Sequence, residues 1–359
     1  MQIRVGSVVV LVLALAAGLG WPRSTLGQDK GGQQDAFQSN VDLVSVYFTV
    51  RDDKKRLASD LPQNRFSVSE DGKPQVIKFF AHHSDVVLNV GVLLDTGTNM
   101  SWILGEEAQA SKLFMEHVVR PTDLGFILSY ASRVETVQLP TSDVALLAKQ
   151  ADTIRIGAAA IGLPERDPAP ERSVWDGGTV GINGRRPLDQ NREAHLYDAI
   201  RVSTHRYLEG EVGRKAVVIV ALSGDVRSES SAEEALKALL ENDVVAYVLQ
   251  ISDASKHDRC DVLHIYERDG RGEYLLKKLA EDTGGRMLEV KGIGKLEDAL
   301  DEISDELHHQ YSLGYYPENK NWDGKFRKVQ ISAGEKAYKV STRKGYYANT
   351  PTPKVAATQ

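Results

Sequence analysis

Four apolar runs of strand length constrain the fold of this chain more than any other feature. They span Val86 to Leu94, Leu124 to Tyr130, Ala216 to Leu222 and Val244 to Ile251. Continuous apolar runs of this length are typical of strands that are buried on both faces of a sheet. Segments with helical spacing alternate with them, over 106–119, 143–154, 196–208, 231–241, 272–283 and 295–309. This order predicts a doubly wound, mainly parallel and Rossmann-like α/β sheet that is covered by helices on both faces.

The two ends of the chain show a different pattern, in which apolar and polar residues alternate as they do in half-buried strands. The alternation is found over 41–50, 66–69, 76–80, 310–316, 326–332 and 338–342. Asp71-Gly72, Asp323-Gly324 and Gly334-Glu335 lie between these strands and predict tight turns, because glycine accepts a positive φ. Since the same pattern brackets the α/β segment, we expect both chain ends to pack together as one β-sandwich-like unit.

The changes of pattern also predict where the segments of the chain begin and end. The predicted order is a signal peptide over 1–27, a disordered linker over 28–40, an N-terminal β segment over 41–85, an α/β domain over 86–309, a C-terminal β segment over 310–348 and a disordered tail over 349–359. A loop insertion is expected within the α/β domain over 157–192, where proline and glycine interrupt the periodic pattern.

The first residues have the layout of a secretory signal peptide. A short charged start, Met1 to Arg4, precedes an apolar stretch from Val5 to Gly20, and small residues follow up to Gly27. This layout predicts cleavage near Gly27 and export to the periplasm, the cell surface or the medium. An uncleaved anchor helix is the alternative, although the stretch is shorter than the ~20 residues of a typical span. We expect no stable membrane span after cleavage, because no other apolar run is long and uncharged.

Composition and motifs narrow the function further. The chain is 42% hydrophobic and 26% charged, which is enough to build a sizeable core. Its net charge of -6 and the lack of a dense basic stripe argue against a nucleic-acid partner. No nucleophile elbow, zinc-protease motif or phosphate-binding loop is found, so we expect no enzyme. Cys260 is the only cysteine, which excludes an internal disulfide and leaves a loop cysteine, a free thiol or an intermolecular bridge.

Several strings in the chain resemble the von Willebrand factor A (VWFA) domain. They are Asp95-Thr96-Gly97-Thr98-Asn99-Met100, Leu196-Tyr197-Asp198-Ala199-Ile200, the run from Arg214 to Val220 and Leu222-Ser223-Gly224-Asp225. The strings Gln310 to Pro317 and Arg343 to Tyr347 are similar to the C-terminal signature of the exported VWFA-related family that is common in acidobacteria. The resemblance covers roughly 41–348, including both flanking β segments.

The resemblance implies a cation site at the carboxyl edge of the sheet, where a partner's carboxylate completes the ligation of Mg²⁺ or a similar ion. Asp95 matches the first ligand, whereas Gly97 and Asn99 stand where the family has two serines. Ala194 replaces a threonine, and Asp225 is displaced by one residue from the last aspartate. We therefore expect no tightly bound cofactor, and at most weak binding of Mg²⁺ or Ca²⁺ by Asp95, Asn99 and Asp225. In the alternative, Asp95 and Asn99 cap the following helix.

Other clusters have simpler interpretations. The segment from Asn319 to Gly324 resembles the start of a calcium loop, but Gln330 stands where the closing glutamate belongs, so we expect a hairpin turn. The pairs His82-His83 and His308-His309 are interpreted as surface histidines at domain junctions, and Asp198 as a structural residue. Strand tyrosines are interpreted as packing between two domains, with interface anchors as the alternative; they are Tyr311, Tyr315, Tyr316, Tyr346 and Tyr347.

The sequence thus favours an exported protein that binds an unknown protein partner or acts as a scaffold. The expected contact surface is the carboxyl edge of the sheet, around Asp95, Asn99, Ala194 and Asp225. Metal-ion-dependent adhesion through Mg²⁺ or Ca²⁺ at Asp95 and Asn99 is the first alternative. A hydrolase with an unrecognised site is the second.

Overall fold

The computed structural model describes residues 43–83, 86–97, 104–154, 194–221, 224–225, 228–252, 271–291, 295–334 and 337–349. The predicted signal peptide, linker and loop insertion lie outside these ranges, as do Asn99, Cys260 and all but one residue of the predicted tail. The chain from Val41 onward forms one compact unit. Of its described helices, none has the length and apolar character needed to cross a membrane.

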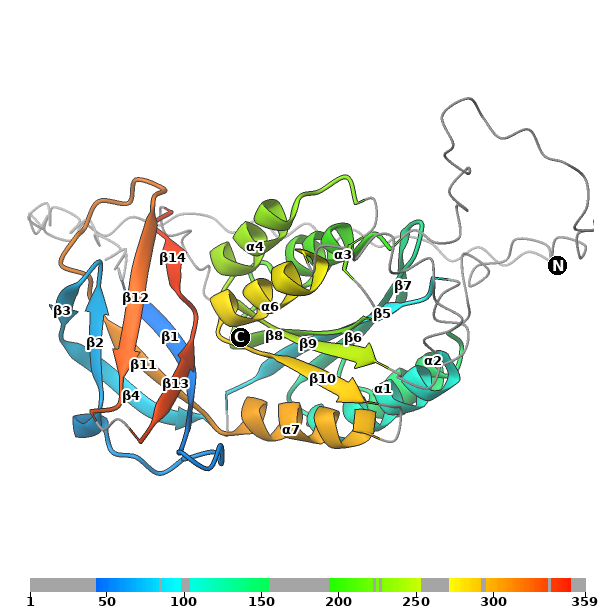
Figure 1. The fold of residues 1–359 in the computed structure, drawn as a ribbon, viewed down its shortest axis with the longest axis horizontal. Coiled ribbons are helices and arrows are strands. Elements are labelled where there is room, and N and C mark those ends of the chain that lie inside the picture. The colour runs from blue at the N-terminus through cyan, green and yellow to red at the C-terminus, as the bar shows by residue number, and fades with distance from the viewer. Residues whose placement is uncertain are drawn as a thin grey trace, which may run out of the picture. The chain divides into compact units, whose positions relative to one another are not determined.

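A six-stranded sheet forms the centre of the protein, in the order β10-β9-β8-β5-β6-β7 (Figure 1). Its strands are β5 (Leu88–Asp95), β6 (Leu124–Tyr130), β7 (Val134–Thr141), β8 (Arg214–Ala221), β9 (Val244–Ser252) and β10 (Met287–Lys291). All neighbours pair in parallel except β7, which runs antiparallel to β6. The predicted doubly wound α/β class is confirmed.

Helices cover both faces of this sheet. The lower face in Figure 1 carries α1 (Leu104–Val118), α2 (Val144–Ala151) and α7 (Leu296–His308). The upper face carries α3 (Leu196–Val202), α4 (Ala232–Glu241) and α6 (Arg271–Thr283). Alternate residues of β5 serve the two faces, because Val90 and Val92 pack below and Leu93 packs above. The predicted helix over 196–208 is α-helical only in its first half, and its second half is the π-helical segment Ser203–Leu208.

Both chain ends build a second layer structure beside the α/β domain. The N-terminal strands are β1 (Val44–Arg51), β2 (Ser67–Glu70), β3 (Lys73–Gln75) and β4 (Ile77–His83), with one short 3-10 turn, Gln63–Arg65. The C-terminal strands are β11 (Gln310–Tyr315), β12 (Phe326–Ser332), β13 (Lys339–Thr342) and β14 (Gly345–Tyr347). They form two sheets, β13-β1-β11-β4 and β14-β12-β2-β3. The prediction that both ends pack as one β sandwich is confirmed.

The strand pairing inside the sandwich differs from the sequence prediction. Asp71-Gly72 does form a tight hairpin with positive φ at both residues, but it joins β2 to the short β3. The strand predicted over 76–80 is instead part of β4, which lies in the other sheet. The predicted turns at Asp323-Gly324 and Gly334-Glu335 are not hairpins, because each connects strands of different sheets. The alternation of apolar and polar residues predicts a strand and its buried face. It does not predict which sheet the strand joins.

The tyrosines of the C-terminal segment lie mainly between the two sheets of the sandwich, which corrects the prediction that they pack between domains. Tyr311 stacks on Phe48 with ring centroids 5.2 Å apart. The hydroxyl groups of Tyr315 and Tyr346 both donate to Oε2 of the buried Glu70, at 2.9 Å each. A buried carboxylate is costly unless it accepts such hydrogen bonds, so these tyrosines are structural partners of the sandwich core.

Ion pairs join the sandwich to the α/β domain. Glu306 on α7 is buried, and its Oε1 accepts from Arg51 of β1 and from Arg286, which precedes β10. Arg286 also contacts Oε2 of the exposed Glu302 at 2.6 Å. Burial alone would lower the pKa of Arg286, but the carboxylates of Glu306 and Glu302 raise it overall. One carboxylate from the α/β domain is therefore shared by two cations, one of which belongs to the sandwich.

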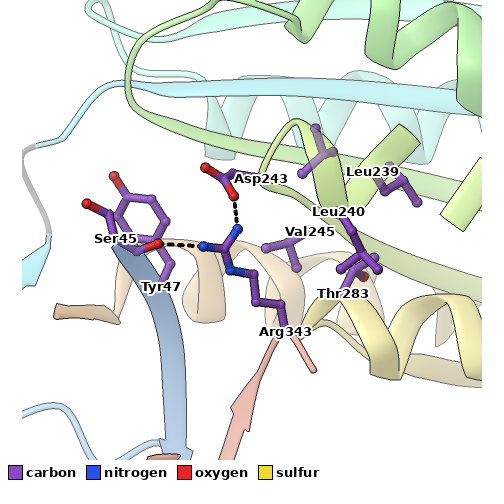
Figure 2. A pocket seen from close by; sticks show the side chains of 9 residues that line it. Ser45, Tyr47, Leu239, Leu240, Asp243, Val245, Thr283 and Arg343 are labelled. Atoms are coloured by element: carbon purple, nitrogen blue, oxygen red, sulfur yellow. Dashed lines mark hydrogen bonds and ion pairs between the residues drawn. The ribbon is translucent and has the colours of Figure 1, made fainter. Parts of the chain in front are cut away.

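A small pocket lies at the same junction, between β1, the turn after α4 and the β13–β14 turn (Figure 2). Figure 2 shows the guanidinium of Arg343 pointing toward the Asp243 carboxylate, with which it forms an ion pair, and toward the Ser45 carbonyl, to which it donates at 2.8 Å. Burial lowers the pKa of Arg343 to about 10. The turn that carries Arg343 packs against Gly284. A Cβ at Gly284 would lie 2.6 Å from the backbone nitrogen of Arg343.

Candidate functional site

The order of the strands defines where a binding crevice is expected. The chain runs outward from β5 through β6 to β7, and then returns to place β8 on the other side of β5. The helices that follow β5 and β8 lie on opposite faces of the sheet. In open α/β sheets, ligands bind at such a switch point, beyond the carboxyl ends of the strands. Asp95 ends β5, and Gly224 and Asp225 follow β8, so two of the predicted site segments meet this expectation.

Asp95 lies below the surface of this edge rather than on it. Its side chain is 5% exposed, and Oδ1 accepts from the Gly97 backbone nitrogen at 2.9 Å. Burial raises the pKa of Asp95 to about 7, although the hydrogen bond from Gly97 opposes the shift. The capping alternative for Asp95 and Asn99 stays a prediction, because residues 98–103, which lead into α1, are outside the described ranges.

Asp225 is directed toward the start of α3. Its Oδ1 accepts from the Tyr197 backbone nitrogen at 3.1 Å, and its Oδ2 accepts from the Ser228 nitrogen at 3.1 Å. The Ser228 hydroxyl donates to Oδ1 as well. Burial raises the pKa of Asp225, although these bonds oppose the shift. The carboxylate thus satisfies backbone donors at the amino end of a helix 28 positions earlier in the chain.

The backbone at Gly224 explains why no side chain stands before Asp225. A Cβ at Gly224 would lie 2.8 Å from the Cα of Gly272, in the first turn of α6. The VWFA family pattern places its last aspartate at the position of Gly224. Any side chain there would have to displace the start of α6, so the one-residue displacement of Asp225 is coupled to this glycine–glycine contact.

This contact supports a pair of graded substitutions. Gly224→Ala should lower the free energy of unfolding by about 1–3 kcal/mol, which is the usual cost of overpacking. Gly272→Ala should cost less, since its Cβ would meet the Gly224 Cα at 3.3 Å instead of 2.8 Å. Urea unfolding of the two variants beside the parent protein measures both values. Equal stability of Gly224→Ala and the parent would show that the loop yields without cost.

Ala194 supplies no side-chain oxygen to the carboxyl edge of the sheet. Its side chain is buried in the apolar cluster beneath α3 and α4, and the next residue, His195, donates its backbone N–H to the Ala131 carbonyl at 3.0 Å. Asp198 accepts from the backbone nitrogens of Glu229 at 2.9 Å and Ser230 at 3.0 Å. Burial alone would raise the pKa of Asp198, but hydrogen bonds from Ser230 and Glu229 lower it overall. Asp198 therefore holds the loop that leads into α4.

The described donors do not by themselves fit the cation site that the family resemblance implies. Gly97 and Ala194 carry no side-chain oxygen, and the oxygens of Asp225 are used by α3 and Ser228. Within the described ranges, no cluster of three or more His, Cys, Asp or Glu could hold a metal ion. Metal binding by Asp95, Asn99 and Asp225 stays a prediction, because Asn99 lies outside the described residues.

Comparison with known proteins gives similarities in structure only. No family model and no curated protein matches the chain. A crystal structure of proximal thread matrix protein 1 from the mussel byssus is 15% identical, with a TM-score of 0.42, and the match covers 64% of this chain and 50% of that one. BatB from Bacteroides thetaiotaomicron is 17% identical, with a TM-score of 0.42, over 61% of this chain and 97% of that one. The thread protein with a zinc-occupied MIDAS motif is 14% identical, with a TM-score of 0.41, over 64% and 50% of the chains.

This chain therefore spans half the length of the thread protein it matches. At these identities, what the other proteins bind is not transferred to this chain. The residues that sequence reasoning missed at this edge are Ser228 and Gly272. Gly272 could be noticed in the sequence as a glycine at the start of a predicted helix. Its role depends on its contact with Gly224 in a distant loop, which the sequence does not show.

Proposed function

We propose that this chain is an exported protein of the von Willebrand factor A type that binds a protein partner directly through the carboxyl edge of its sheet. The sheet order and the family-like strings after β5 and β8 support this assignment. The strings Gln310 to Pro317 and Arg343 to Tyr347 support a place in the acidobacterial VWFA-related family. The role is binding or scaffolding rather than catalysis, and the signal-peptide layout of the first residues supports export.

One observation carries the proposal of direct binding. Both described acidic residues at the switch point are used inside the protein, since Asp95 accepts from Gly97 and Asp225 accepts from the start of α3. A metal-bridged contact needs carboxylates that face a shared ion with open coordination positions. A partner that meets this edge would therefore contact backbone and side chains of the loops without an ion between them.

Thermal melting separates direct binding from metal-dependent adhesion. We expect the same melting temperature in EDTA and in excess Mg²⁺, Mn²⁺ or Ca²⁺, because on this proposal no cation binds specifically to the folded state. A specific cation at a hundred times its dissociation constant would add about 2.7 kcal/mol. A stabilising shift that disappears in Asp95→Asn would instead establish the metal-dependent alternative.

Capture from the native envelope fraction tests the surface itself. Arg133 follows β6 at the carboxyl edge and is 48% exposed, whereas the exposed Glu211 precedes β8 at the opposite edge. Partners retained by the parent protein in EDTA should be lost with Arg133→Glu and kept with Glu211→Lys. Partners that bind both variants equally would place the contact elsewhere, and a requirement for divalent ions would contradict direct binding.

A further inference from the structure

The chain passes between the sandwich and the α/β domain at two places, and one side chain contacts both. The first passage leads from β4 to β5, and the second leads from α7 through His309 into β11. Arg214, at the start of β8, donates from Nη2 to the Val86 carbonyl at 2.8 Å and from Nε to the same oxygen at 3.2 Å. Its Nη1 donates to the Leu307 carbonyl. A single guanidinium thus ties the two connections together.

This guanidinium is buried and interacts with one carboxylate and one further cation. Arg214 is 2% exposed, and burial lowers its pKa although the carboxylate of Asp123 opposes the shift. Asp123 is itself buried and accepts from the backbone nitrogens of Leu88 at 2.8 Å and Arg120 at 3.1 Å. The Arg120 side chain is the second cation, and it acts against the charge on Arg214. Further positive charge at this place has one carboxylate to balance it.

His308 is the last residue of α7 and directly follows Leu307, whose carbonyl accepts from Arg214. The ring is half-buried, and its Nε2 has no hydrogen-bond partner among the described residues, which corrects its interpretation as a surface histidine. Burial, Arg120 and Arg214 lower the pKa of His308, while Asp123 and the Val118 carbonyl oppose the shift. On the facing helix α1, His117 pairs with Asp301 of α7 at 3.2 Å. The lowered pKa of His308 favours the neutral form of its ring.

We propose that Arg214 and His308 form an acid-sensitive lock at the junction of the sandwich and the α/β domain. In the neutral state, Arg214 holds the Val86 and Leu307 carbonyls and fixes both connections. Protonation places a third cation beside Arg214 and Arg120, with a buried N–H that has no acceptor. Repulsion and desolvation then favour a state in which the end of α7 leaves Arg214, and the two parts gain freedom to move.

The sign of the effect follows from the direction of the shift. A histidine whose pKa is lower in the folded state binds fewer protons when folded than when unfolded. The closed junction therefore keeps its full stability above the ordinary histidine pKa, and it loses stability as the pH falls below that value. The lock releases in acid and closes near neutral pH.

Distance measurements on the full chain test this proposal. Spin labels are placed on Lys328→Cys in β12 and Lys277→Cys in α6, both exposed, in a background with Cys260→Ser. Double electron–electron resonance is then recorded at about pH 7.5 and about pH 5. We expect one narrow distance at the higher pH and a distribution roughly twice as wide, or shifted, at the lower pH.

Two variants make the outcome specific. His308→Gln cannot gain the charge and should keep the narrow distance at both pH values, even though Asp95 titrates in the same range. His309→Gln removes the exposed neighbour, whose Nδ1 contacts the Asp305 carbonyl at 2.7 Å, and should behave like the parent protein. A distance that does not depend on pH in the parent, or the same broadening in His308→Gln, would overturn the proposal.

Discussion

Replacing Glu306 with alanine should lower the free energy of unfolding by about 3–5 kcal/mol, the cost of removing one member of a buried ion pair. The carboxylate is 3% exposed and is shared by Arg51 and Arg286. Without it, Arg51 and Arg286 lose the carboxylate that they share, and only the exposed Glu302 still pairs with Arg286. The loss should be visible in urea unfolding, and it should exceed the cost of a deleted surface contact.

Glu302 provides the matched control on the same helix. It contacts Arg286 at 2.6 Å, but its side chain is 56% exposed. Exposed ion pairs contribute at most about 1 kcal/mol, so Glu302→Ala should change stability little. If Glu306→Ala were no less stable than Glu302→Ala, the shared carboxylate would have no special role in holding the sandwich to the α/β domain.

Asp95→Asn should stabilise the protein at alkaline pH and leave it unchanged in acid. The pKa of Asp95 is raised to about 7, so the folded protein binds a proton more tightly than the unfolded chain does. The contribution of this group to stability is therefore greatest below about pH 4, falls as the pH rises to about 7, and is constant above that value. A shift of this size corresponds to at most about 4 kcal/mol, and asparagine still accepts from Gly97.

Urea unfolding of Asp95→Asn at several pH values measures this difference directly. Asp123→Asn is the opposite control, because this buried aspartate accepts from two backbone nitrogens and faces Arg214, so its loss should destabilise the protein. Parallel stability profiles of Asp95→Asn and the parent across the pH range would contradict the raised pKa.

The fold was predictable where local pattern and burial agree. The run from Val90 to Leu94 is apolar throughout because both faces of β5 are covered. Ser231 forms a capping box with Glu234 at the start of α4, a local pattern that marks where a helix begins. The pairing of the sandwich strands was not predictable, since Gly324 and Gly334 have positive φ whether the turn joins neighbours or crosses to another sheet.

The candidate site was predictable only as a location. Strand order follows from the alternation of strands and helices, and it places Asp95 and Asp225 near a switch point. What each carboxylate does depends on contacts from distant segments, such as the Tyr197 nitrogen for Asp225. The close approach of Gly224 to Gly272 is of the same kind. No local pattern encodes these contacts, so resemblance to a family could suggest ligands without deciding their surroundings.

The insertion of one domain between the strands of another also sets an order of folding. Every strand and helix of the α/β core lies within one continuous segment, from β5 to α7, so this part can complete its core as soon as it has been synthesised. By contrast, β1 pairs only with β11 and β13, and β4 pairs with β11. Until the ribosome has synthesised β11, which begins at Gln310, the backbone edges of β1 have neither of these partner strands. We expect these first strands to depend on chaperones that cover exposed strand edges during synthesis.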